Sequence, residues 1–92
     1  MFLLFLLSLI EDETYSQFFH QLYTKHQQRM YYAAWQILKN AQTAEDIMQD
    51  TFYMIASNDR VLQRLMELSN QSEIYVVNYI TKMCRNLSLI HI

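Results

Sequence analysis

The stretch "AEDIMQDTF", Ala44 to Phe52, decides the fold class because its polar and apolar residues repeat with the period of a helix. Asp46, Gln49, Asp50 and Tyr53 stand at positions i, i+3, i+4 and i+7, so a helix places them on one side. The mainly apolar residues centre on the other side of the helix: Ala44, Ile47, Met48, Thr51, Phe52 and Ile55. A helix with one apolar side needs neighbours to cover it, so the pattern predicts a helical bundle.

The polar side of this helix carries acids without a compensating cation. No Lys or Arg lies four residues after Asp46 or Asp50, so neither acid gains a neutralising neighbour along the helix. Two interpretations follow from the pattern alone. The side is an ordinary solvated face, or it is a surface that meets a basic partner.

The composition extends the helical prediction to the whole chain. The sequence has no glycine and no proline, where average usage gives about six and about five in this length. Sheet hairpins usually need glycine-containing turns, whereas helices can be joined without them. The sequence therefore predicts an all-α fold, a small orthogonal bundle of four to five helices, as a single domain over residues 1–92.

Outside the opening stretch, caps and apolar stripes define the other elements. A long helix is expected over residues 14–39, with Asn40 as its C-terminal stop and Thr43 as the N-cap of the next helix. The long helix carries an apolar stripe: Phe19, Leu22, His26, Met30, Ala33 and Ile37. Residues 1–12, which include "MFLLFLLSLI", are expected to form a short apolar helix docked on the bundle.

The C-terminal half is predicted to contain a turn, a short helix, a loop and a final helix. "SNDR", residues 57–60, is typical of a turn, and a short helix is expected over residues 61–68. "SNQS", residues 69–72, is predicted to be a loop. The final helix begins at Ser72 or Glu73 and continues through Asn86 or beyond.

The final helix also divides into two sides. Its apolar side is formed by Val76, Val77, Ile80, Met83, Cys84 and Leu87. Its polar side is formed by Tyr75, Asn78, Tyr79, Lys82 and Asn86, with Arg85 at the margin. No acid occurs from Ile74 onward, and aromatic rings, amides and cations together suit single-stranded DNA: rings stack on bases and cations meet phosphates. An ordinary polar face remains the alternative.

Other chemistry finds little support in the sequence. Cys84 stands alone and on the apolar side, so a packed thiol in a reducing, cytoplasmic setting is expected. The three histidines lack metal-ligand spacing, and no catalytic motif or cofactor-binding loop is found, so we expect no enzyme and no cofactor. The apolar start has no basic region before it and about half the length needed to cross a bilayer, which argues against membrane insertion.

Four motifs in order give the chain a family resemblance. They are "FHQLY" (19–23), "MYYAAWQIL" (30–38), "AEDIMQDTF" (44–52) and "ITKMCRNL" (80–87). Over residues 18–87 the chain resembles region 2 of bacterial sigma-70 family sigma factors of the extracytoplasmic-function type. The family patterns are F-x-x-L-Y, L-x-x-x-A-x-x-I-L, A-E-D-L-V-Q-E-T-F and I-A-R-N-L.

The resemblance implies two binding surfaces. The family's A-E-D helix docks on the β′ clamp helices of core RNA polymerase, which assigns polymerase binding to Asp46, Gln49, Asp50 and Tyr53. The family's last helix holds the unpaired non-template strand of the promoter minus-ten element. That assigns DNA binding to Tyr75, Asn78, Tyr79, Lys82, Arg85 and Asn86, with Tyr79 standing where many members have tryptophan. An anti-sigma factor is a further candidate partner.

The chain also departs from the family. Residues 57–73 lack the F-R-G-x-x-S-F pattern that helps to select promoter bases, so promoter specificity does not carry over. The basic tail after R-N-L and the second, helix-turn-helix domain are missing. The ending "LSLIHI" resembles a translated sequencing adapter, so we expect a truncated fragment with a non-native tail over residues 87–92. The alternative is that Leu89, Ile90 and Ile92 extend the last helix.

Three other function classes remain as alternatives to the sigma factor. The first is a helical protein–protein interaction module that binds polymerase without touching DNA. The second is a membrane-attached helical protein, and the third, which the sequence favours least, is an enzyme.

Overall fold

The computed structural model describes residues 2–91, which form five helices and no strand. The helices are α1 (Phe2–Ser8), α2 (Glu13–Leu38), α3 (Ala41–Ala56), α4 (Asp59–Gln71) and α5 (Glu73–His91). The prediction of an all-α bundle is therefore confirmed. Met1, the start of the predicted N-terminal helix, and Ile92, the end of the tail, lie outside the described residues.

Helix α2 matches the predicted long helix to within one residue at each end. It begins after Asp12, whose carboxylate accepts a hydrogen bond from the backbone N–H of Tyr15 at 3.1 Å. Its C-cap is Lys39, which adopts a left-handed conformation with φ of 54° and donates its N–H to the Trp35 carbonyl. The predicted stop at Asn40 is therefore wrong by one residue, because a lysine takes the position that glycine or asparagine usually fills.

Helix α3 begins three residues earlier than predicted because Asn40, not Thr43, is its N-cap. The Asn40 side-chain oxygen accepts hydrogen bonds from the backbone N–H of Thr43 at 2.9 Å and from its hydroxyl at 3.1 Å. Asn40 has the extended backbone of an N-cap, with φ of −142° and ψ of 120°. Thr43 is the partner of the cap rather than the cap itself.

Helix α4 is longer than the predicted short helix, and the predicted loop "SNQS" is wrong. Only Ser57 and Asn58 separate α3 from α4, and the Asn58 side chain caps α4 by accepting from the N–H groups of Arg60 and Val61. At the other end, Ser72 alone separates α4 from α5. Its extended backbone interrupts the helix, and its hydroxyl accepts from the N–H of Ile74 at 3.3 Å, so no four-residue loop is needed.

The last helix agrees with the sequence prediction over the described residues, whereas the first ends at Ser8, so the predicted helix over residues 1–12 is wrong for residues 9–12. Helix α1 packs on the bundle through Leu6, which is fully buried. Helix α5 starts at Glu73 and continues through Leu89 and Ile90 to His91. Over residues 2–91, none of the helices combines the length and apolar character needed to cross a bilayer.

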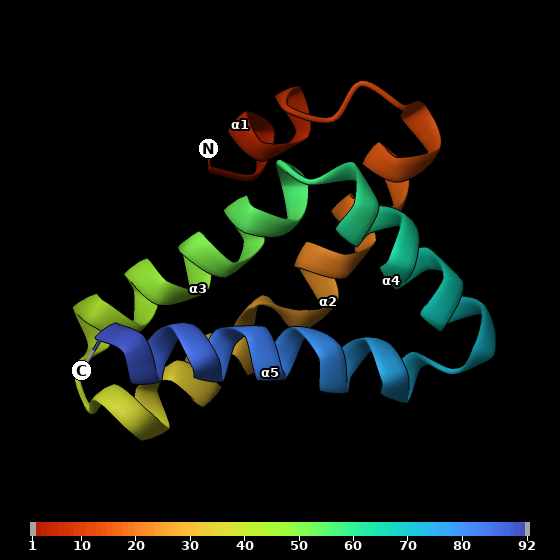
Figure 1. Ribbon diagram of the computed structural model, residues 1–92. Coiled ribbons are helices and arrows are strands. Elements are labelled where there is room, and N and C mark those ends of the chain that lie inside the picture. Colours follow the sequence, from red (N-terminus) through yellow and green to blue (C-terminus); the bar gives the residue numbers. More distant parts are fainter. Residues whose placement is uncertain (1, 92) are drawn as a thin grey trace.

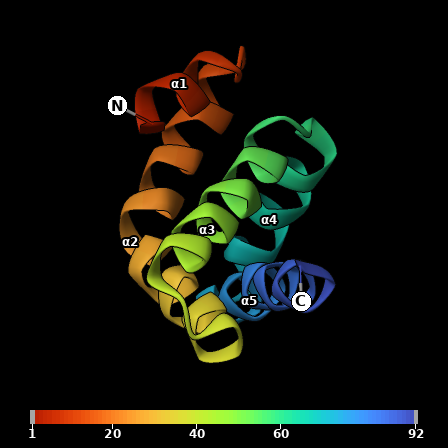
Figure 2. The ribbon, with the colours of Figure 1, turned by 90° about the vertical axis from the view of Figure 1, so that its left-hand side faces the viewer.

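The helices cross at steep angles rather than running in parallel. Helix α5 passes in front of α2 in Figure 1, with α3 above it and α4 joining its N-terminal end. In Figure 2 the same helix is seen almost end-on, whereas α2 and α3 run across the view. Helix α1 covers the end of the bundle where α2 begins and α3 ends. This arrangement leaves one side of α3 and one side of α5 facing outward.

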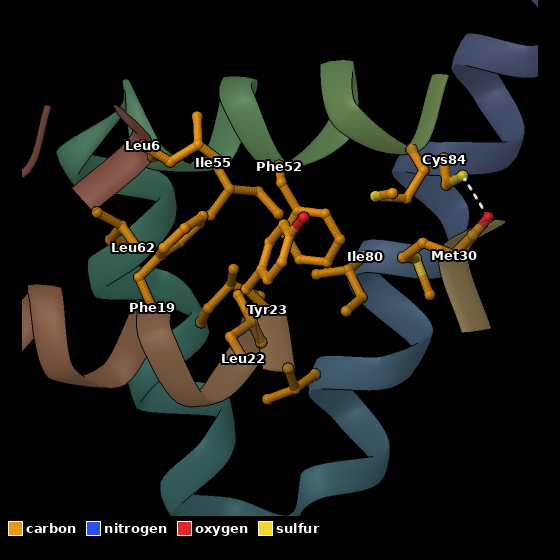
Figure 3. Close-up of a cluster of buried hydrophobic side chains, with 14 of the residues drawn as sticks. Leu6, Phe19, Leu22, Tyr23, Met30, Phe52, Ile55, Leu62, Ile80 and Cys84 are labelled. Atoms are coloured by element: carbon orange, nitrogen blue, oxygen red, sulfur yellow. Dashed lines mark hydrogen bonds between the residues drawn. The ribbon is translucent and has the colours of Figure 1, made fainter. Parts of the chain in front are cut away.

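The core is an aromatic cluster at the centre and aliphatic side chains around it. Phe52 contacts the rings of Tyr23 and Phe19, edge to face, with centroids 4.9 and 6.1 Å apart. Figure 3 shows these rings between Leu22 on α2, Ile55 on α3 and Ile80 on α5. Cys84 lies at the far end and donates its thiol hydrogen to the Met30 carbonyl at 3.2 Å. The apolar side of the stretch Ala44 to Phe52 is thus the inner wall of the fold.

The buried set includes three polar residues, and helical periodicity placed two of them, His26 and Thr51, on apolar sides. His26 is buried, as predicted for a packed core histidine, but it also contacts Glu73. Ile37 is only half-buried, which corrects the C-terminal end of the predicted stripe. Thr51 and Ser88 are fully buried because each hydroxyl donates to the carbonyl four residues before it.

Candidate functional site

The outward side of α3 carries the four residues that the sequence assigns to polymerase binding. Asp46, Asp50 and Tyr53 are exposed, and Gln49 is half-buried. We call these four residues the acidic face. The face looks outward because Ile47, Met48 and Phe52, on the opposite side of the same helix, are buried in the core. The structure therefore brings the four predicted residues together on one surface.

The carboxylates of the acidic face have no cationic partner within residues 2–91. The close contacts between basic and acidic side chains in this part of the chain are His26–Glu73 and Arg64–Glu67, and both lie on other helices. Asp46 and Asp50 are one helical turn apart, so their charges repel each other weakly. The surface keeps its negative charge and can attract positively charged groups from solution.

Glu45 enlarges this negative surface, although the sequence analysis did not single it out. It lines a hollow of about 290 Å³ between α2 and α3, together with Gln27, Gln28, Tyr31 and Met48. Burial, and to a smaller extent the charge of Glu45, raises the pKa of the nearby Tyr23 phenol above its usual value. In the sequence, only its position directly before Asp46 pointed to Glu45. In the structure, its side chain lies on the side of α3 that borders α2.

Tyr53 has a neighbour that periodicity along one helix could not reveal. Its ring is stacked on the ring of Phe5 from α1, with centroids 6.4 Å apart and planes within 2° of parallel. Both rings are about half exposed. The acidic face therefore ends at an aromatic pair contributed by two helices.

The outward side of α5 carries the six residues that the sequence assigns to DNA binding. Tyr75, Asn78, Lys82, Arg85 and Asn86 are exposed, whereas Tyr79 is half-buried and packs against the core. We call these six residues the amide–cation face. Because Tyr79 is partly covered, Tyr75 offers the more accessible ring for stacking.

A shallow hollow joins four of these six residues. It measures about 310 Å³ and is lined by Asn78, Thr81, Lys82, Arg85, Asn86 and Leu89. Tyr75 and Tyr79 lie outside it. The sequence analysis missed Thr81 and Leu89, although Thr81 stands three residues after Asn78 and Leu89 four residues after Arg85. The Thr81 hydroxyl oxygen is buried and has no hydrogen-bond partner among the described residues.

One partly buried contact fixes the start of α5. His26 Nε2 on α2 lies 2.8 Å from Glu73 Oε2 in the first turn of α5. His26 Nδ1 is buried without a partner among residues 2–91, so Glu73 provides the imidazole's hydrogen bond in this part of the chain. The contact attaches the helix that bears the amide–cation face to the longest helix of the bundle.

Cys84 and the other metal-binding residue types form no reactive cluster in the described chain. Burial raises the pKa of the Cys84 thiol, and this effect outweighs the lowering by hydrogen bonds and by Arg85. No group of three or more His, Cys, Asp or Glu side chains within residues 2–91 is placed to hold a metal ion.

The chain was compared with models of known protein families, with curated proteins and with solved structures, and none of these comparisons gives a match.

Proposed function

We propose that the chain is the region 2 domain of a bacterial sigma factor of the extracytoplasmic-function type. In this proposal the acidic face of α3 binds the β′ clamp helices of core RNA polymerase. The amide–cation face of α5 holds the unpaired non-template strand of the promoter minus-ten element. The resemblance of four ordered motifs to that family supplies the identity of both partners.

The observation that carries the proposal is the separation of two outward helix faces of opposite character. The acidic face presents carboxylates that no cation neutralises within the described residues. The amide–cation face lies on a helix in which the only acid is Glu73, and that acid contacts His26. A basic protein surface suits the first face, and a polyanion suits the second.

The amide–cation face supplies groups for holding a strand without chemical reaction. Tyr75 offers a ring on which a base can stack, an interaction of about 1–3 kcal/mol per base. Lys82 and Arg85 can contact phosphates, and the amides of Asn78 and Asn86 can hydrogen-bond base edges. Two cations give weak binding on their own, and the chain has a net charge of −2, so polymerase is needed to bring the strand to this face.

The DNA half of the proposal is tested by crosslinking. Core polymerase is loaded with the chain and mixed with a bubble template whose unpaired non-template strand carries a photoreactive base in the minus-ten element. We expect a crosslink to α5 that is lost in the Tyr75→Ala, Lys82→Ala double variant, while polymerase binding is unchanged. A Gln63→Ala variant, altered at an exposed position of α4, serves as the control.

The alternative function is a helical module that binds polymerase without contacting DNA. The observation in its favour is that only two cations lie on the amide–cation face. In the same experiment this alternative predicts polymerase binding by the unaltered chain but no crosslink to the promoter strand. That result would remove the DNA half of the proposal and keep the polymerase half.

A further inference from the structure

Apolar side chains remain exposed where α1 meets the C-terminal half of α3. Phe5 is 51% exposed and Tyr53 is 46% exposed, and their neighbours Leu4 and Met54 are exposed to a similar degree. We call these four residues the apolar ledge. Helix α1 is anchored by Leu6, which is fully buried and lies near Ile55 in Figure 3, so packing fixes which side of α1 faces outward.

The aromatic part of the ledge is already formed in the free chain. The Phe5 and Tyr53 rings are parallel within 2°, with centroids 6.4 Å apart, so they offer one continuous apolar surface from two helices. Aromatic side chains have few rotatable bonds, and a pair that is already stacked loses little freedom on binding. Such residues are often the energetic centre of a protein interface.

The ledge continues directly into the acidic face. Tyr53 belongs to both, because it follows Asp50 by one helical turn and Asp46 by two. At a rise of about 1.5 Å per residue, Asp46 and Tyr53 are roughly 10 Å apart along α3. The two aspartates and Tyr53 thus form one strip along the outward side of α3, and the Phe5 ring extends this strip from α1.

From this strip we infer that the apolar ledge is a second part of the polymerase-docking surface, covered by the same basic helix that meets Asp46 and Asp50. This inference rests on the proposed function. The partner helix carries Lys or Arg opposite the two aspartates and an apolar side chain about two turns further on, against Phe5 and Tyr53. The negative strip selects a basic partner, and the ledge contributes most of the affinity.

The experiment measures the affinity of the full chain for a β′ clamp-helix fragment. Phe5→Ser is compared with Ile74→Ser, a matched control because Ile74 is 60% exposed and lies on α5. We expect Phe5→Ser to weaken clamp binding by about tenfold or more, as for an interface aromatic, and Ile74→Ser to leave it unchanged. Melting curves check the fold, and Leu4→Ser replaces Phe5→Ser if the latter unfolds.

Several results would overturn the inference. Clamp affinity that is unchanged in both Phe5→Ser and Leu4→Ser shows that the ledge is not part of the interface. A parent chain that dimerises through Phe5, or that binds phospholipid vesicles through it, with clamp affinity unaffected, assigns the ledge to a second copy or to a lipid surface. If the double variant Asp46→Arg, Asp50→Arg loses clamp binding but the ledge variants keep it, the proposed function stands and only this inference is removed. A parent that does not bind the clamp removes both.

Discussion

His26 on α2 and Glu73 on α5 are joined by a 2.8 Å contact between Nε2 and Oε2, and the two side chains differ greatly in exposure. The His26 side chain is 5% exposed and the Glu73 side chain is 45% exposed. A surface carboxylate therefore provides the hydrogen bond of a buried imidazole. This contact holds the start of α5, and hence the amide–cation face, in a fixed position relative to α2.

Glu73→Ala should destabilise the fold more than its surface position suggests. The substitution leaves both ring nitrogens of a buried imidazole without a protein partner, which costs about 1–3 kcal/mol. Urea denaturation measures this change. Glu67→Ala is the control, because its partner Arg64 is exposed and such a pair contributes roughly 0–1 kcal/mol. Equal effects of the two substitutions would show that the His26 contact has no special weight.

The stability of the fold should decrease at alkaline pH partly because of Tyr23. Burial, with a smaller contribution from Glu45, raises the pKa of the folded-state phenol above its usual 10.0. The folded state therefore holds this proton more tightly than the unfolded state. The resulting stabilisation is fully present below pH 10 and is lost as pH rises through the folded-state pKa.

Tyr23→Phe tests this dependence, because phenylalanine keeps the ring and removes the ionising hydroxyl. We expect its free energy of unfolding to fall less between neutral and strongly alkaline pH than that of the parent. Tyr32→Phe, altered at an exposed ring, should follow the parent curve. Identical curves for the parent and Tyr23→Phe would contradict the assignment.

Asn40→Ala should cost about 0.5–2 kcal/mol of stability, because it removes the side-chain oxygen that caps α3. Thr43→Ala should cost less, since the backbone N–H of residue 43 can still donate to Asn40. Thermal unfolding of the two variants compares them directly. A larger loss for Thr43→Ala would favour the N-cap that the sequence indicated.

The helical elements could be predicted largely because helix formation leaves a periodic pattern. The apolar residues around Phe52 repeat with the helical period, and the same residues form the inner wall of the bundle. The boundaries were harder, because a cap depends on backbone conformation. Asn40 can end one helix or begin the next, and the left-handed conformation of Lys39 decides between them.

The candidate surfaces were predictable only where they lie on one helix. Asp46, Gln49 and Asp50 share a face by spacing alone, so the sequence grouped them correctly. Phe5 and Tyr53 are 48 residues apart, and their stacking depends on how α1 docks, which no periodicity encodes. The partial burial of Tyr79 likewise follows from the packing of α5 against its neighbours.

Asp50→Lys should raise stability and lower polymerase binding at once. It removes the repulsion between Asp46 and Asp50 and creates an acid–lysine pair four residues apart, in the favourable order along the helix. The expected gain is about 0.5 kcal/mol in the free energy of unfolding. Denaturation and clamp binding are measured on the same preparation. A stability gain without loss of binding would indicate that the acidic face is only a solvated helix surface.

Affinity for the β′ clamp-helix fragment tests the central claim most directly. The parent chain, the double variant Asp46→Arg, Asp50→Arg and a control double variant are each titrated with the fragment. The control, Glu11→Arg, Glu67→Arg, makes the same charge change at exposed positions elsewhere. We predict that the parent and the control bind the fragment, whereas the acidic-face variant loses binding although it remains folded. Equal binding by all three, or no binding by the parent, would contradict the account.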